Sequence, residues 1–185
     1  MSVKALELGT VEVAIDPLDL EAVYRAHADT VTRWAARLLG RPGEAGDVTQ
    51  EVFFVVQRKL ASFQPAAATL ETWLFRITEN VVRSFRRRER MRRLFFGDEE
   101  APEVADPAPD AAEQLSRREK VKTVYQVLEK LREADRTLLV LFELEGYPGA
   151  KVAELTGTDP AAIWVKLHRA RRRFAEHLDA LEAGR

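Results

Sequence analysis

The sequence contains no cysteine, which excludes disulfide frameworks, thiolate zinc sites and thiol catalysis. It also has no apolar run near the roughly 20 residues that a bilayer span needs, and its first ten residues lack the apolar core of a secretory signal. Neither sign of charge dominates, because 29 Lys and Arg stand against 30 Asp and Glu. Any nucleic-acid binding must therefore depend on local segregation of charge. These absences predict a soluble, cytoplasmic protein.

Strand signals are nearly absent as well. Only residues 11–15 alternate between apolar and polar, and this run is too short and isolated to seed a sheet. Helical spacing instead predicts a first helix that begins at Asp16 and ends at Gly40. A second helix is expected over about 46–62, and a third after it with Thr69 as its N-cap. The predicted fold class is all-α.

An acidic, proline-rich stretch divides the chain. Residues 97–110 contain six acidic residues, three prolines and neither Lys nor Arg. Such a segment can neither continue a helix through its prolines nor bury enough apolar surface to order itself, so we expect a flexible linker. The expected organisation is an N-terminal extension (1–15), a helical domain (16–95), the acidic linker (96–112) and a second, smaller helical domain (113–185).

The smaller domain is predicted to contain four helices, at about 113–129, 133–145, 148–155 and 160–181. The last two have the pattern of a helix-turn-helix. A small residue, Ala153, allows close helix approach, Gly157 opens the turn, and Ile163 and Leu167 anchor the second helix. Residues 166–173 of that helix carry five Lys and Arg and no acid, which favours docking into a DNA major groove.

A second basic cluster closes the larger domain. Seven arginines lie within residues 83–93, interrupted by one acid, Glu89. Four polar residues of this helix recur on one face, opposite its apolar stripe: Arg76, Asn80, Arg83 and Arg87. Such a face suits phosphates for positioning and an amide for a base edge. The alternative is a solvated helix end whose arginines complement the helix dipole.

The polar side of the second helix is also unusual, because it presents Asp47, Gln50, Glu51 and Phe54 together. An aromatic ring among acids is typical of a protein interface, although a ring folded over a neighbouring helix fits the pattern equally well. Motifs for phosphate-binding loops, dinucleotide folds, zinc proteases and serine triads are missing. We therefore expect no catalytic residue, no metal, no cofactor and no small-molecule substrate.

The order of these motifs resembles that of bacterial sigma factors. Residues 47–53, which read DVTQEVF, resemble the core-polymerase-binding motif of that family. Residues 72–80, TWLFRITEN, resemble its promoter −10 region, and residues 166–172, KLHRARR, look like its helix for the −35 element. With two domains and a short linker, the chain is similar to the extracytoplasmic-function (group IV) sigma factors of the sigma-70 superfamily.

The resemblance implies a promoter-specificity subunit that directs DNA melting and transcription initiation by core RNA polymerase. It implies region 2 over 16–95 and region 4 over 113–185. The polymerase face would be Asp47, Gln50, Glu51 and Phe54. The −10 set would be Arg76, Asn80, Arg83, Arg86, Arg87 and Arg90. The −35 set would be Ala162, Trp164, Val165, Lys166, His168, Arg169 and Arg172. Promoter DNA and core polymerase are the implied partners, together with an anti-sigma factor, which in this family is often membrane-attached.

The recognition helix departs from the family. Its entry, residues 161–165, reads AAIWV where relatives usually have Gly-Thr-Val-Lys-Ser. Small and apolar side chains cannot make the bidentate hydrogen bonds that select a base, so a tolerant −35 preference is expected.

Two other functions fit part of the sequence. A free-standing helix-turn-helix regulator would bind operators without polymerase, but it would leave the first domain without a purpose. A sigma mimic that titrates an anti-sigma factor is favoured by the departures in the recognition helix. Binding to core polymerase would distinguish a sigma factor from a free-standing regulator. Transcription from a cognate promoter would distinguish it from a sigma mimic.

Overall fold

The computed structural model describes residues 19–96 and 111–184, and within these ranges it contains helices and turns but no strand. The all-α prediction is confirmed. The expected linker and N-terminal extension fall largely or wholly outside the described residues. Within those two ranges, no helix has both the length and the apolar character needed to cross a bilayer.

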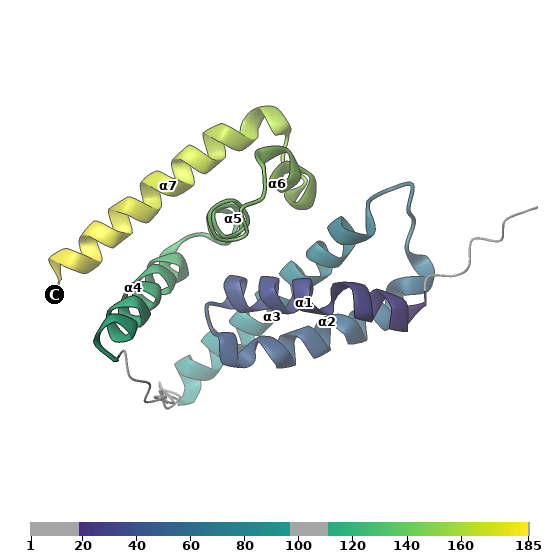
Figure 1. Cartoon of the computed structure of the whole chain (residues 1–185), viewed down its shortest axis with the longest axis horizontal. Coiled ribbons are helices and arrows are strands. Elements are labelled where there is room, and N and C mark those ends of the chain that lie inside the picture. Colours follow the sequence, from purple (N-terminus) through teal and green to yellow (C-terminus); the bar gives the residue numbers. More distant parts are fainter. Residues whose placement is uncertain (1–18, 97–110, 185) are drawn as a thin grey trace, which may run out of the picture.

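The N-terminal domain is a bundle of three helices (Figure 1). These are α1 (Leu20–Leu39), α2 (Ala45–Lys59) and α3 (Leu70–Phe96), with short 3-10 turns η1 (Pro42–Glu44) and η2 (Leu60–Ser62) on either side of α2. Each helix buries one apolar stripe against the other two, as its spacing predicts. The fully buried side chains at the centre include Val31, Val48, Val52, Val56, Leu74 and Phe75.

The ends of these helices follow local capping rules. The expected cap at Asp16 is wrong: Asp19 is the N-cap of α1, and its carboxylate accepts from the Glu21 N–H at 3.2 Å, while Asp16 itself lies outside the described residues. Gly40 ends α1 as predicted, with φ +73°. Thr69 caps α3 as predicted, because its hydroxyl accepts from the Thr72 N–H at 3.2 Å.

The C-terminal domain consists of α4 (Ala111–Lys130), α5 (Glu133–Leu139), α6 (Gly149–Thr156) and α7 (Pro160–Ala183). The single helix expected over 133–145 is wrong at its end, where α5 widens into a π-turn, η3 (Val140–Leu144). There the N–H of Glu145 bonds the carbonyl of Val140, five residues back, at 2.9 Å. The wider turn leaves the Glu145 carboxylate against α1, a contact from the other domain that no local pattern predicts.

A buried arginine holds α4 to α5. Arg136 is 6% exposed, and its guanidinium donates to the carbonyls of Leu128, Glu129 and Leu131 at 2.8, 3.1 and 3.0 Å. These carbonyls end α4, so the cation satisfies acceptors that the helix leaves unpaired. Burial lowers the pKa of Arg136 to about 10, and the group stays charged at neutral pH.

Candidate nucleic-acid and protein interfaces

The predicted polymerase face lies on α2, whose two sides differ strictly in burial. Val48, Val52 and Val56 are completely buried against α1 and α3. The predicted residues lie on the other side, where Asp47 and Gln50 are exposed and Phe54 is 57% exposed. Phe54 therefore does not fold over a neighbouring helix. A large apolar ring left in water beside acids is suited to burial against a partner.

Glu51 differs from the other members of this face. Its carboxylate accepts from the Arg88 guanidinium at 2.7 Å, which ties α2 to the basic half of α3. An exposed pair of this kind contributes little to stability, so Glu51 can exchange Arg88 for another partner at small cost. The sequence did not indicate this pair, because the two residues are 37 positions apart. It also did not indicate Tyr24 of α1, an exposed ring that packs edge-on against Phe53, with centroids 4.7 Å apart.

The −10 set is presented by α3, but its members have different surroundings. Arg87 and Arg90 are exposed, and neither forms an ion pair with any residue that the structure describes. Asn80 is exposed, and its side-chain oxygen accepts from Arg83 at 3.4 Å. Arg76 reaches the turn of the helix-turn-helix, where a Cβ added to Gly157 would lie 3.4 Å from its Nη2. Unpaired guanidinium groups on the distal half of α3 are available to phosphates.

Arg86 is turned inward. Its guanidinium donates to the carbonyls of Leu38 and Leu39, at 3.4 and 3.3 Å, and so caps the C-terminus of α1. Burial lowers its pKa, with the nearby Arg41 acting in the same direction. A residue that the sequence groups with DNA contacts thus has a structural role in the bundle, and a phosphate contact from it would compete with this cap.

The helix-turn-helix forms as predicted. Val152, Ala153, Ile163 and Leu167 are all at most 2% exposed, so the two helices pack closely. Gly157 makes the turn with φ +63°. The N-cap of α7 is Asp159, whose carboxylate accepts from the Ala161 N–H at 2.9 Å. This geometry fixes the angle at which α7 is presented.

The exposed side of α7 carries most of the −35 set. Trp164, Val165, Lys166, His168, Arg169 and Arg172 are exposed, and Ala162 is half-buried. Trp164 is 58% exposed but not free, since its ring packs against Phe142 with centroids 5.5 Å apart. Two further arginines of α7 are held by acids of α5 and η3: Arg171 pairs with Glu143 at 2.6 Å and Arg173 with Asp135 at 2.7 Å.

A groove in the C-terminal domain has no counterpart in the sequence prediction. It measures about 260 Å³, and most of its lining is apolar. The lining comes from α4, α5, η3 and α7: Val124, Leu128, Leu139, Glu143, Leu144, Arg171 and Phe174. Periodicity identifies the apolar stripe of each helix but does not show which part of a stripe its neighbours leave uncovered. Within the described ranges, no group of three or more His, Asp or Glu is placed to hold a metal ion.

Family models match both halves of the chain. The model for Sigma-70 region 2 matches residues 23–92, and the model for Sigma-70, region 4 matches residues 122–174. Two helical domains that match these regions in this order place the chain in the sigma-70 class.

Comparison with individual relatives narrows the family assignment. The chain is 34% identical over 161 residues to the ECF RNA polymerase sigma factor SigE of Mycolicibacterium smegmatis, covering 85% of this chain and 61% of that protein. It therefore spans less than two thirds of the length of SigE. It is 31% identical to the sigma factor CnrH of Cupriavidus metallidurans, covering 79% and 80%, and 28% identical to CarQ of Myxococcus xanthus, covering 88% and 90%. The chain belongs to the extracytoplasmic-function sigma factors of the sigma-70 family.

Two solved structures share the fold. CnrH in complex with the cytosolic domain of CnrY matches with a TM-score of 0.58 and 24% identity, covering 87% of this chain and 88% of that one. The sigma factor RpoE of Bartonella quintana, in complex with the anti-sigma factor NepR, matches with a TM-score of 0.59 and 23% identity, covering 87% and 97%.

Proposed function

We propose that this chain binds core RNA polymerase through the polymerase face of α2 and directs it to promoters. In this proposal α3 contacts the −10 element, α7 contacts the −35 element, and the protein acts in the cytoplasm without catalysing a reaction itself. The domains would be region 2 over 16–95 and region 4 over 113–185, with 96–112 as linker and 1–15 as extension. The observation that carries the proposal is the occurrence of regions 2 and 4, in that order, on one chain.

The surfaces support separate roles for the two domains. Phe54 offers an apolar anchor that is 57% exposed, and the acids around it can pair with a basic surface. Arg87 and Arg90 supply phosphate contacts that carry no sequence information. Asn80 lies on the same helix and can hydrogen-bond an unstacked base, whose capture would stabilise melted DNA.

We further propose that an anti-sigma protein binds this chain. Of the two structures that share its fold, one contains RpoE with the anti-sigma factor NepR, and the other contains CnrH with the cytosolic domain of CnrY. The apolar groove between α4 and α7 would receive an amphipathic helix of that partner, because its lining is apolar and its rim carries Glu143 and Arg171. A membrane attachment would belong to the partner.

The experiment that tests this function is reconstitution with core RNA polymerase. The purified chain should co-elute with core polymerase, and the holoenzyme should enrich discrete fragments from genomic DNA of the organism that carries the gene. Enrichment by the chain alone, without core, would favour a free-standing regulator. Binding to core without any enriched fragment would favour a sigma mimic.

A further inference from the structure

Trp164 presents a large aromatic surface on the exposed side of α7. Its side chain is 58% exposed, whereas tryptophan is on average a largely buried residue. It is the fifth residue of α7, and the following turns of the same face carry His168 and Arg172, both exposed. A recognition helix points the residues of its N-terminal half toward the base edges. The indole therefore lies where α7 would meet bases.

The indole ring is held by residues outside α7. It meets the ring of Phe142 in η3 edge to face, with centroids 5.5 Å apart and ring planes at 80°. It also lies against the start of α6, where a Cβ added to Gly149 would be 3.0 Å from Trp164 Cζ2. The absence of a side chain at Gly149 thus permits the close approach of the ring.

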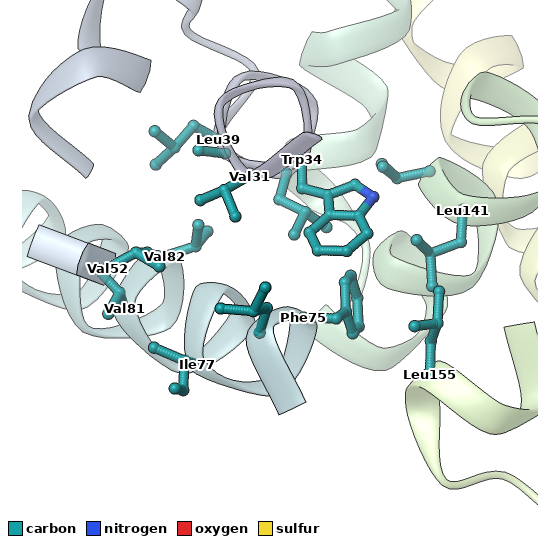
Figure 2. Close-up of a cluster of buried hydrophobic side chains, with 14 of the residues drawn as sticks. Val31, Trp34, Leu39, Val52, Phe75, Ile77, Val81, Val82, Leu141 and Leu155 are labelled. Atoms are coloured by element: carbon teal, nitrogen blue, oxygen red, sulfur yellow. The ribbon is translucent and has the colours of Figure 1, made fainter. Parts of the chain in front are cut away.

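The support beneath the indole is itself fixed. The Arg171 guanidinium lies over the Phe142 ring, 5.3 Å from its centroid, and its Nε donates to the Glu143 carboxylate at 2.7 Å. Leu141, which precedes Phe142 in η3, and Leu155 of α6 are completely buried in the core (Figure 2). The indole thus projects from a rigid platform, so little side-chain entropy is lost when it meets a ligand.

The charge around the indole is complementary to DNA. Lys166, Arg169 and Arg172 are exposed on the same helix. The first acid within α7 is Glu176, more than three turns beyond the indole, and the acid just before the helix, Asp159, is engaged in the N-cap. Cations of this kind bind phosphates and position a helix, but they do not select a base. Base selection near them falls to the indole.

An indole offers a base edge an apolar surface and a single N–H donor, so it cannot make the bidentate pair that selects guanine or adenine. The apolar feature of the major groove is the 5-methyl group of thymine. A polar base edge against the ring would lose water without gaining a hydrogen bond. We propose that Trp164 is a specificity-determining residue that reads the 5-methyl group of one thymine in the −35 element, and that Phe142 and Gly149 position its ring. This inference rests on the proposed function.

Deoxyuridine substitution tests the proposal, because deoxyuridine differs from thymidine only in lacking the 5-methyl group. The DNA is the fragment most enriched by the wild-type holoenzyme, and each thymine of its −35 element is replaced in turn. Affinity of the holoenzyme for each fragment is measured by competition. One replacement should weaken wild-type binding by about fourfold, the value of one buried methyl group. Replacement of thymines outside the two promoter elements is the control on the DNA.

Trp164→Ala completes the comparison. Holoenzyme with this chain should bind the thymine fragment about fourfold more weakly than wild type and should no longer distinguish it from the deoxyuridine fragment. Trp164→Phe keeps an aromatic ring and should keep part of the discrimination. The matched control is Val121→Ala, because this apolar side chain is 50% exposed on α4 and outside α7. It should discriminate as the wild type does.

Phe142→Leu tests the platform. It keeps an apolar side chain in η3 but removes the ring against which the indole rests. Discrimination between the thymine and deoxyuridine fragments should fall below twofold. The dependence of binding on salt should stay unchanged, since Lys166 and Arg169 still meet phosphates. A merely structural role for Phe142 would instead lower stability in urea unfolding and leave the discrimination of the folded chain intact.

Two results would overturn the inference while leaving the sigma function intact. One is a −35 element in which no thymine changes affinity more than twofold on replacement. The other is a Trp164→Ala chain that still discriminates as the wild type does, which would assign the indole to the sugar-phosphate backbone or to a protein partner. If the wild-type holoenzyme enriches no fragment at all, the proposed function fails, and the inference fails with it.

Discussion

Removal of the Phe54 ring should weaken polymerase binding more than it weakens the fold. The side chain is 57% exposed, so less than half of its surface leaves water when α2 packs. Full burial of a large apolar side chain contributes about 1.5–3 kcal/mol, and the share already buried here predicts a loss of about 1 kcal/mol for Phe54→Ala. The neighbouring Phe53 is 7% exposed, and Phe53→Ala should instead cost about 3–5 kcal/mol, the usual cost of truncating a buried ring.

Binding to core polymerase should depend more on Phe54 than on Phe53. A central aromatic anchor typically costs 2 kcal/mol or more when truncated, which is about a 30-fold loss of affinity. The affinity of labelled Phe54→Ala for core polymerase would be measured by fluorescence titration, and its stability by urea unfolding. Val165→Ala is the matched control, because this apolar side chain is 52% exposed on α7 and outside the proposed face.

Two results would refute this reasoning. Affinity within about twofold of wild type in a folded Phe54→Ala chain would remove Phe54 from the interface, since a hot spot is worth more than that. A stability loss like that of Phe53→Ala would show that the ring is buried in solution. Charge reversal should be confined to Asp47, because Glu51→Arg would also set a cation against Arg88.

The remaining predictions concern DNA binding and pH. Arg86→Gln should destabilise the chain by about 1–3 kcal/mol in urea unfolding, because it removes a half-buried cap of α1. Arg87→Gln should leave stability unchanged but flatten the dependence of promoter affinity on salt by about one unit of log–log slope, whereas an unaltered slope would mean no phosphate contact. Hydrogen bonds from two threonine hydroxyls lower the pKa of Glu154 to about 2. The contribution of the Glu154 carboxylate to folding stability should therefore be complete above its ordinary pKa of 4.5 and decline as pH falls toward 2. The difference in free energy of unfolding between wild type and Glu154→Gln should accordingly narrow from pH 6 to pH 3. Because Ala162 and Val165 cannot donate hydrogen bonds to bases, single changes in the −35 element should each cost under about 1 kcal/mol of open-complex formation, and losses of 1–3 kcal/mol would indicate strict readout.

Local signals were sufficient for most of the fold. Gly40 and Gly157 end helices with positive φ because their missing side chains allow it, and the sequence places both at the end of an apolar stripe. Thr69 caps α3 through a bond to a residue three positions away. Interactions of this range are encoded in neighbouring residues, so periodicity and capping rules can identify them.

The sequence could not indicate contacts between distant segments. Arg83 and Arg86 look alike in a run of arginines, yet one binds an acid 50 positions away and the other caps the end of a different helix. Glu145, which directly follows the π-turn at 140–144, likewise contacts α1 in the other domain. Helical spacing says which side of a helix faces the core. It does not say which helix lies opposite or which charges meet there.

The most direct measurement of the central claim is run-off transcription with purified components. Core polymerase alone, core with the wild-type chain, and core with Phe54→Ala would be supplied with the fragment that the holoenzyme enriches. If the chain is a promoter-specificity subunit, the wild type should give a transcript of one discrete length, and core alone should give no such transcript. Phe54→Ala should need about 30-fold more protein for the same yield. The same transcripts with and without the chain would contradict it.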